Sequence, residues 1–205
     1  MCWFCENGVP DGVLSGSALP ENVLPPGVLP PDVLPQSVPP QGVLPESQVR
    51  ERFRREPGRV VAEYLTGILG LIDETGWIVQ AVSARDSRPA WAYTAGLTVH
   101  GLPELVVTGL DQPLSAMVLN AVAAESLSSG PLGPGDVLTL RGGPPMEVVA
   151  LAEPSAHLSL AITLYGPDVR ALQLVYADDS GAFPWSPSYR GGRGGQPVLG
   201  VRDDE

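Results

Sequence analysis

The sequence predicts an α+β fold, a single two-layer domain in which about three helices cover a mostly antiparallel or mixed sheet. Two observations support this prediction. Stretches with helical spacing of apolar residues alternate with short apolar runs bounded by Gly, Pro or polar turns, in the order helix, three strands, helix, two strands, helix, strand. That order departs from the regular alternation of a doubly wound parallel sheet. A folded part of about 150 residues is also long enough to bury one core.

Residues 59–75 are predicted to form a core helix that stops at Gly76. Its weak points are Gly67 and Gly70, because glycine lowers helix propensity. A shorter helix candidate, residues 46–56, precedes it and ends at Pro57. The apolar residues expected on the buried stripe of the core helix are Val60, Val61, Tyr64, Leu65, Ile68, Leu71 and Ile72.

Two further helices are predicted at residues 113–129 and 155–165. Pro113 suits the first turn of the former and Gly130 its end. The apolar stripe expected on that helix contains Leu114, Met117, Val118, Ala121, Val122 and Leu127. The predicted strands are residues 77–84, 91–97, 104–110, 136–141, 146–153 and 170–178.

Residues 10–44 form seven pentapeptides in register, from PDGVL to PQGVL, and almost all of them begin with Pro. Proline at this spacing prevents a continuous helix or a central strand. We therefore expect an extended or disordered spacer that a nonspecific protease cuts rapidly; a segment laid over the domain and a peptide substrate carried in cis are alternatives. The predicted organisation is a Cys-x-x-Cys head (1–9), a Pro-rich repeat arm (10–45), a globular domain (46–202) and an acidic tail (203–205).

The charge distribution excludes several classes of partner. The formal net charge is -11, and all twelve basic residues are Arg. We therefore expect no nucleic-acid partner and no membrane partner, because both draw affinity from clustered cations. The one basic stretch, residues 50–59, is interleaved with Glu and is typical of a solvated helix face. The opening residues lack a secretory pattern, which predicts a cytoplasmic protein with reduced cysteines. The oligomeric state is not predicted.

Several segments together resemble the bacterial domain-of-unknown-function family 4262. They are the opening MCWFC, the run GWIVQAV, the block PAWAYTAGLTVHGLPELVVTGL, the pair EPSAHLSLAITLYG and the ending from ALQLVYADDSG to GGQPVLG. The resemblance covers nearly all of the chain except the repeat arm, which departs from the family pattern. It implies a cytoplasmic bacterial protein with a single domain, and it implies no activity, cofactor or catalytic residue.

The first candidate site is a metal centre formed by Cys2, Cys5, His100 and His157, which are all the cysteines and histidines of the chain. Zinc is the metal that such ligands favour, and Cys-x-x-Cys is a familiar half-site. The two histidines belong to no paired motif, so only the fold could bring them together. A redox dithiol or a hydrophobic head docked on the domain would account for the same cysteines.

The second candidate is a ligand site lined by aromatic rings and arginines. Arginine on a glycine-rich backbone can fork around a carboxylate or phosphate, and aromatic rings provide flat walls. A core edge filled by the rings, with solvated arginines, is the structural alternative. The residues of this candidate are Trp91, Tyr93, Trp185, Tyr189, Arg190 and Arg193.

His100 and Glu104 form a third candidate, because a histidine and a carboxylate four residues apart could perform general acid–base catalysis. No nucleophile and no common nucleotide, hydrolase or metalloprotease motif accompanies them. The leading hypothesis is an accessory domain that binds a small anionic ligand or a peptide. The alternatives are a zinc-dependent enzyme and a scaffold that recruits a partner through the repeat arm.

Overall fold

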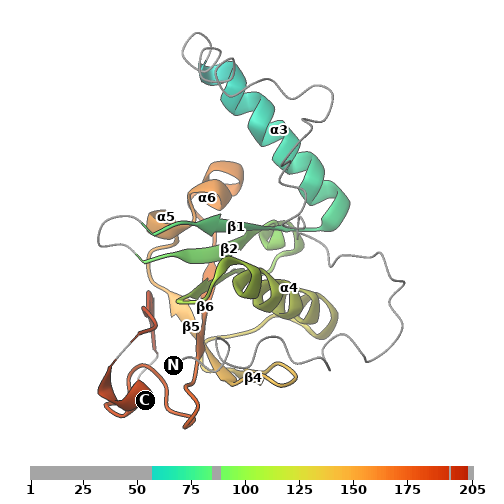
Figure 1. Ribbon diagram of the computed structural model, residues 1–205. Helices are drawn as coiled ribbons and strands as arrows, with labels where there is room; N and C mark the ends of the chain where they lie inside the picture. The colour runs from blue at the N-terminus through green and yellow to red at the C-terminus, as the bar shows by residue number, and fades with distance from the viewer. Residues whose placement is uncertain (1–56, 85–88, 194, 203–205) are drawn as a thin grey trace, which may run out of the picture.

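The computed structural model describes residues 57–84, 89–193 and 195–202. In these ranges the chain forms one mixed sheet with helices against both faces (Figure 1), so the predicted α+β class and mixed sheet are confirmed. The elements in chain order are α3 (Pro57–Thr75), β1 (Ile78–Val82), β2 (Trp91–Ala95), the 3-10 helix η2 (Leu97–His100), β3 (Glu104–Thr108), α4 (Gln112–Ser129), β4 (Val137–Thr139), β5 (Pro145–Leu151), α5 (Pro154–His157), α6 (Ser159–Tyr165), β6 (Ala171–Tyr176), the 3-10 helix η3 (Tyr189–Gly192) and β7 (Gly200–Val201).

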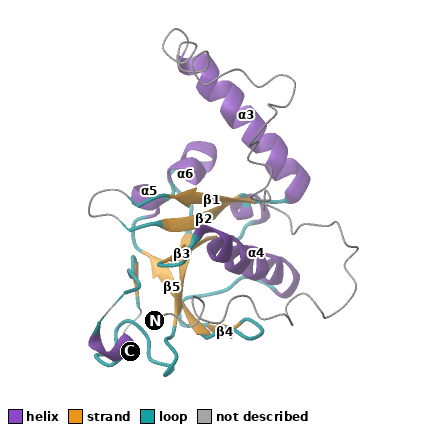
Figure 2. Cartoon of the chain, viewed as in Figure 1, coloured by secondary structure: helices purple, strands orange, loops and turns teal. Residues whose placement is uncertain are grey.

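The sheet has the strand order β1-β2-β3-β6-β5-β4, and the short β7 pairs with the edge of β5 that β4 also uses. All neighbouring strands are antiparallel except β3 and β6, which run parallel with Glu104 opposite Ala171. The last long strand is therefore inserted between β3 and β5 rather than added at an edge (Figure 2). As a result, every residue of β6 is buried.

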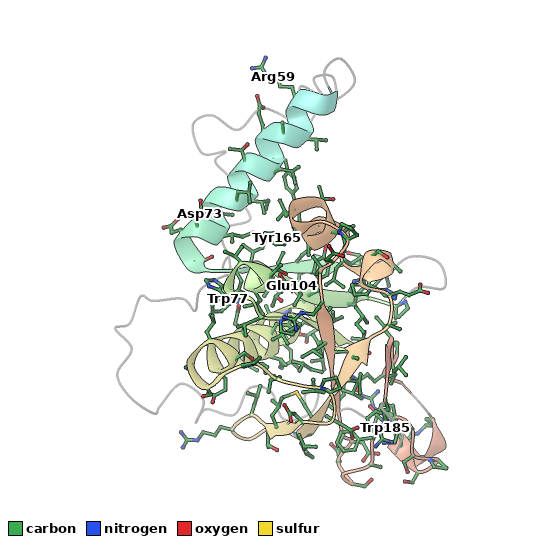
Figure 3. All side chains as sticks on the ribbon, turned by 180° about the vertical axis from the view of Figure 1, so that it is seen from behind. Arg59, Asp73, Trp77, Glu104, Tyr165 and Trp185 are labelled. Carbon is green, nitrogen blue, oxygen red and sulfur yellow. The ribbon has the colours of Figure 1, made fainter. Side chains whose placement is uncertain are left out.

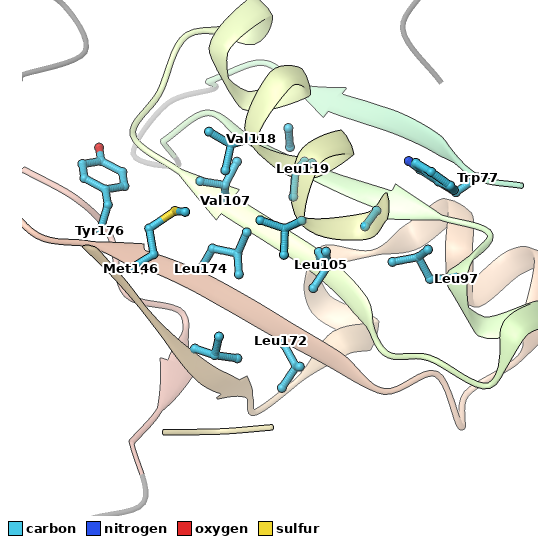
Figure 4. Packing of buried hydrophobic residues seen from close by; sticks show 14 residues of the cluster. Trp77, Leu97, Leu105, Val107, Val118, Leu119, Met146, Leu172, Leu174 and Tyr176 are labelled. Carbon is cyan, nitrogen blue, oxygen red and sulfur yellow. The ribbon is translucent and has the colours of Figure 1, made fainter. Parts of the chain in front are cut away.

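The larger core lies between the sheet and α4 (Figure 4). Successive side chains of a strand face opposite sides of the sheet, so alternate residues of the central strands point toward this helix. Leu105 and Val107 of β3 and Leu174 of β6 pack against Val118 and Leu119 of α4. The sheet and α4 form two layers, and the helices on the opposite face add a third layer that the two-layer prediction did not include.

Helix α4 begins one residue before the predicted start and ends at the predicted Ser129. Asp111 caps its first turn by accepting a 2.9 Å hydrogen bond from the Leu114 nitrogen, and Gly130 follows its last residue. Its orientation differs in part from the expected stripe, since Ala121 and Leu127 are exposed. Apolar residues surround much of this helix, so their spacing alone does not decide which side faces the sheet. The buried residues are Ser115, Val118, Leu119, Asn120, Val122, Ala123 and Ser126.

A smaller core lies on the opposite face, under α5 and α6. Tyr93 of β2 and Val106 of β3 point to this side and pack with Leu158 and Ala161. The hydroxyl of Tyr93 accepts a 3.1 Å hydrogen bond from the Leu160 nitrogen, which attaches α6 to the sheet. Burial raises the pKa of Tyr93, and the hydrogen bonds from Leu160 and Ser159 only partly oppose this effect.

Helix α3 differs most from the sequence prediction. It extends away from the sheet (Figure 1), and among the stripe residues whose side chains the structure describes, only Ile72 is buried. Leu65 and Ile68 are half-buried against the smaller core, whereas Val61 and Tyr64 are exposed. Helix α3 is ~28 Å long at 1.5 Å per residue. It runs past β1, the edge strand of the sheet, so nothing in the described chain covers its N-terminal turns. No helix in these ranges has the length and apolar content needed to cross a bilayer.

The Cys-x-x-Cys head, the repeat arm, the short helix candidate at residues 46–56 and the acidic tail lie outside the described residues.

Candidate functional site

One carboxylate organises the loop that follows β6. Oδ1 of Asp178 accepts hydrogen bonds from the nitrogen of Ser180 (2.9 Å), from its hydroxyl (2.7 Å) and from the nitrogen of Ala182 (2.9 Å), and Oδ2 accepts one from the nitrogen of Arg190 (2.6 Å). Burial alone would raise the pKa of this carboxyl, but the hydrogen bonds stabilise its ionised form and lower the pKa to about 2. An ionised Asp178 therefore ties the turn after β6 to Arg190.

Arg190 has an unusual backbone conformation, with φ 48 and ψ 36. It is the one residue other than glycine with a positive φ in the described ranges, and this conformation costs about 1–2 kcal/mol for an L-residue. Its guanidinium lies 5.5 Å from the ring centre of Tyr189, which is buried. A Cβ at Gly195 would collide with this guanidinium, so glycine there lets the arginine side chain lie against the backbone. The position of the Arg190 side chain is thereby restricted.

Trp185 lies in the same loop (Figure 3), is half-buried and is fixed by two neighbours. Its ring stacks on Phe183 with a centroid distance of 5.0 Å and an interplanar angle of 7°. The guanidinium of Arg202 lies 4.6 Å from the Trp185 ring centre, and its Nε donates a 2.8 Å hydrogen bond to Oε1 of Glu147 on β5. Arg202 thus links the loop to the sheet through one cation–π contact and one ion pair.

Two buried glutamines attach the segment between this loop and β7 to the sheet. Oε1 of Gln173 accepts a 2.7 Å hydrogen bond from the Leu199 nitrogen, and its Nε2 donates 2.8 Å to the Pro197 carbonyl. Oε1 of Gln196 accepts a 3.1 Å hydrogen bond from the Tyr176 nitrogen. The two glutamine side chains take the place of the backbone partners that a neighbouring strand would provide. The buried backbone groups of this segment therefore keep hydrogen-bond partners.

We call Trp185, Arg190, Arg193 and Arg202 the C-terminal basic surface. Arg193 is exposed, and its Nε donates a 3.2 Å hydrogen bond to the Arg190 carbonyl. Guanidinium groups bind carboxylate and phosphate oxygens through paired N–H donors, and the guanidinium of Arg202 lies over the Trp185 ring. The chemistry available here is the binding of a small anion.

Two of the six predicted ligand residues lie elsewhere. Trp91 and Tyr93 are on β2 and face α5 and α6, where Trp91 Nε1 donates a 3.1 Å hydrogen bond to the His157 carbonyl. Tyr93 is buried, and so is Tyr189 in the C-terminal loop. These three rings therefore pack within the fold, whereas Trp185, Arg190 and Arg193 belong to the one segment that connects β6 to β7.

Glu104 and His100 are not partners in the structure. Glu104 is fully buried at the start of β3, and its two carboxylate oxygens accept five hydrogen bonds from Thr94, Gly96, Leu97 and Thr98. His100 is exposed and lies 3.3 Å from the Gly76 carbonyl through Nε2. A buried carboxylate that accepts this many hydrogen bonds holds the β2–β3 connection in place.

The predicted metal ligands can be followed only in part, because Cys2 and Cys5 lie outside the described residues. His100 follows the C-terminal end of β2, whereas the ring of His157 lies 5.9 Å, centroid to centroid, from Trp91 at the N-terminal end of the same strand. A strand of this length spans ~13 Å, so the two histidines do not meet. Within the described ranges, no three residues of metal-binding type are grouped to hold an ion.

Sequence reasoning missed Asp178, Phe183 and Arg202. The turn DDSG and the aromatic pair FPW are visible in the sequence, since Asp followed by Ser and Gly is typical of a side-chain-stabilised turn. Arg202 has no such signature. Its role depends on β7 pairing with β5, which brings it to Glu147.

Comparison with protein families gives one match. The model of a family described as a domain of unknown function, DUF4262, matches residues 71–190, which is more than half of the chain. The match contains the sheet from β1 to β6 and the loop up to Arg190. No curated protein and no solved structure matches the chain significantly.

Proposed function

The chain belongs to the DUF4262 family, whose description names no activity, and from that premise we propose that it is an accessory domain of the bacterial cytoplasm that binds a small anionic ligand at the C-terminal basic surface. The observation that supports the proposal most directly is the arrangement around Asp178. A single ionised carboxylate holds the backbone of Arg190, so the arginine-bearing loop has a defined shape without ligand.

Pre-organisation matters because a ligand that must order a loop spends binding energy on that ordering. Arg190 is restricted by Tyr189 and by the close approach to Gly195, and Arg202 is held over Trp185. Arg193 is exposed on the same loop. A ligand carboxylate or phosphate would take paired N–H donors from Arg190 and Arg193, while an apolar portion would contact the edge of the Trp185 ring, whose faces are covered by Phe183 and Arg202.

Charge supports a small anion rather than an extended polyanion. Arg190, Arg193 and Arg202 follow one another in the C-terminal segment of a chain of net charge -11, and the exposed Asp179 belongs to the same segment. A long polyanion would meet repulsion from the rest of the surface, whereas a compact anion contacts only the local cations. A peptide would be recognised by the same chemistry through one carboxylate or phosphate group.

The test is a titration of the full chain with inorganic phosphate and with benzoate, followed by intrinsic tryptophan fluorescence and calorimetry. Benzoate joins a carboxylate to a ring that can contact the edge of Trp185, so it should bind more tightly than phosphate. The Arg193→Gln variant should weaken binding about tenfold or more, because a charge-assisted hydrogen bond contributes roughly 1.5–3 kcal/mol. Trp185→Phe should remove most of the fluorescence change.

Arg141→Gln is the matched control, since Arg141 is exposed on the β4–β5 turn and the substitution removes the same charge. It should leave the affinity unchanged. Equal weakening by both variants would indicate nonspecific attraction, and an absence of heat and fluorescence change up to ~10 mM of either probe would contradict the proposal.

A further inference from the structure

The outer side of α3 carries an apolar strip that the described chain leaves uncovered. Tyr64 is 54% exposed and Leu71 37%, and their separation of seven residues, about two turns, brings both side chains to the same side of the helix. A Cβ added at Gly67 would meet nothing within 4 Å, so the middle of the helix is open. Large apolar side chains clustered on one exposed helix are typical of an interaction surface. We call this set of residues the α3 strip.

The charges of α3 are placed opposite to what its own dipole favours. A helix is stabilised by acidic residues in its first turn and basic residues in its last, yet α3 has Arg59 near its start and Asp73 and Glu74 near its end. Arg59 forms a 3.1 Å pair with Glu63, and both side chains are about half exposed or more, so this pair contributes little. Asp73 and Glu74 have no ion pair within the described ranges.

We propose that the α3 strip binds a second copy of this chain, with the two α3 helices antiparallel about a twofold axis near Gly67. Antiparallel pairing places the basic start of each helix beside the acidic end of the other. It also opposes the two helix dipoles, and the isologous contact closes at two copies. This inference concerns α3 alone and does not depend on the proposed ligand site.

The spacing of the strip fits such a pair. Residues 64, 67 and 71 are separated by steps of three and four, the spacing that forms a helix–helix seam. If Tyr64 packs against the partner's Leu71, the axis passes between Gly67 and Ile68. Arg59 then lies within one turn of the partner's Glu74. Glycine at the axis lets the backbones approach closely, as small residues do at helix crossings.

The repeat arm is a poorer occupant of the α3 strip. Its Val-Leu pairs supply apolar surface, but residues 10–44 contain three acidic residues, Asp11, Glu21 and Asp32, and no basic residue. The arm therefore offers no positive charge that could pair with the acidic residues at the end of α3. A second copy supplies the apolar surface and the complementary charge together.

The first experiment measures the mass of the full chain by sedimentation over a range of concentrations. We expect a reversible monomer–dimer equilibrium. Tyr64→Asp should raise the dissociation constant at least tenfold, whereas Val137→Asp should not change it. Val137 is 62% exposed on β4, far from α3 (Figure 1), and is therefore a matched control for an added charge at an exposed apolar residue.

Charge reversal tests the orientation. Arg59→Glu and Glu74→Arg should each weaken the dimer several-fold, and the double variant should regain much of the loss. Parallel helices would place like ends together, so the double variant would then give no recovery.

Crosslinking provides an independent measurement, in a background with Cys2→Ser and Cys5→Ser. Gly67→Cys should be joined efficiently by a short bismaleimide. Gly58→Cys should not, because the two copies of residue 58 stand about 28 Å apart in the antiparallel pair. A chain that stays monomeric at all concentrations, or a dimer that Tyr64→Asp leaves intact, would overturn the proposal. Protection of the arm in a monomer would identify the arm as the occupant instead.

Discussion

The backbone nitrogen of Arg190 donates a 2.6 Å hydrogen bond to Oδ2 of Asp178, and this bond joins the end of the central strand β6 to the arginine-bearing loop. Arg190 occupies the left-handed region, which an L-residue enters only when its surroundings compensate. The hydrogen bond to a carboxylate provides that compensation, because a charged acceptor makes it stronger than a neutral one.

Replacing Asp178 by Asn should therefore loosen the loop. An amide has one acceptor oxygen, and its NH₂ group would face donors that now point at Oδ1 or Oδ2. We expect a loss of about 1–2 kcal/mol in the free energy of unfolding, together with a change in Trp185 fluorescence as the ring leaves Phe183. Denaturant unfolding and emission spectra would measure both, and Asp179→Asn, at an exposed neighbour, should change neither.

Acid should weaken the same contact over a definite pH range. The pKa of Asp178 in the folded chain is about 2, below its ordinary value of 3.8, so its ionisation favours the folded state. The contribution is complete above pH ~4 and is lost as the pH falls toward 2, because protonation then favours the unfolded chain. The difference in unfolding temperature between the native chain and Asp178→Asn should shrink from pH 5 to pH 2.5. A constant difference would show that the carboxylate charge does not matter.

The strands could be predicted from sequence because each is a short apolar run with a turn former at both ends. The insertion of β6 beside β3 could not be predicted. Ala171 pairs with Glu104 although α4, the β4–β5 hairpin and α6 separate them along the chain. For α3, helical spacing predicted a helix, and Ile72 is indeed buried. Spacing does not tell whether another element covers the rest of the stripe. The prediction that Tyr64 lies in the core is therefore wrong, because this side chain is exposed.

The candidate site could likewise be predicted only in part. Trp185 and Arg190 could be proposed because aromatic and arginine residues cluster near each other in the sequence. The carboxylate that shapes their loop could not, because the hydrogen bond between Asp178 and Arg190 depends on how the turn closes. Its neighbours in the sequence suggested that Tyr93 lines a ligand site. The side of the sheet that a strand residue faces depends on which elements pack against that side.

Glu104→Gln should destabilise the fold strongly. Five donors converge on the carboxylate, and the amide nitrogen of glutamine would replace one acceptor with a donor in a fully buried place. We expect a cost of about 3 kcal/mol or more, since buried donors would lose their partners. Denaturant midpoints would measure it against Glu153→Gln, which changes an exposed side chain. If the two variants unfold alike, the hydrogen bonds to Glu104 do not hold the β2–β3 connection.

Gly96→Ala tests the backbone at the start of the β2–β3 connection. Gly96 has φ 132, and a Cβ there would lie 2.6 Å from Cα of Trp77 and 2.7 Å from the carbonyl oxygen of Gly76. Both atoms are backbone, so neither can move without displacing the junction of α3 and β1. Gly101→Ala is the matched control, because Gly101 also has a positive φ, 74, but a Cβ would meet nothing within 4 Å. We expect Gly101→Ala to cost about 1–2 kcal/mol from conformation alone and Gly96→Ala to cost at least ~3 kcal/mol. Unfolding curves of the two variants give the comparison directly, and equal costs would mean that the β2–β3 connection can shift away from Trp77.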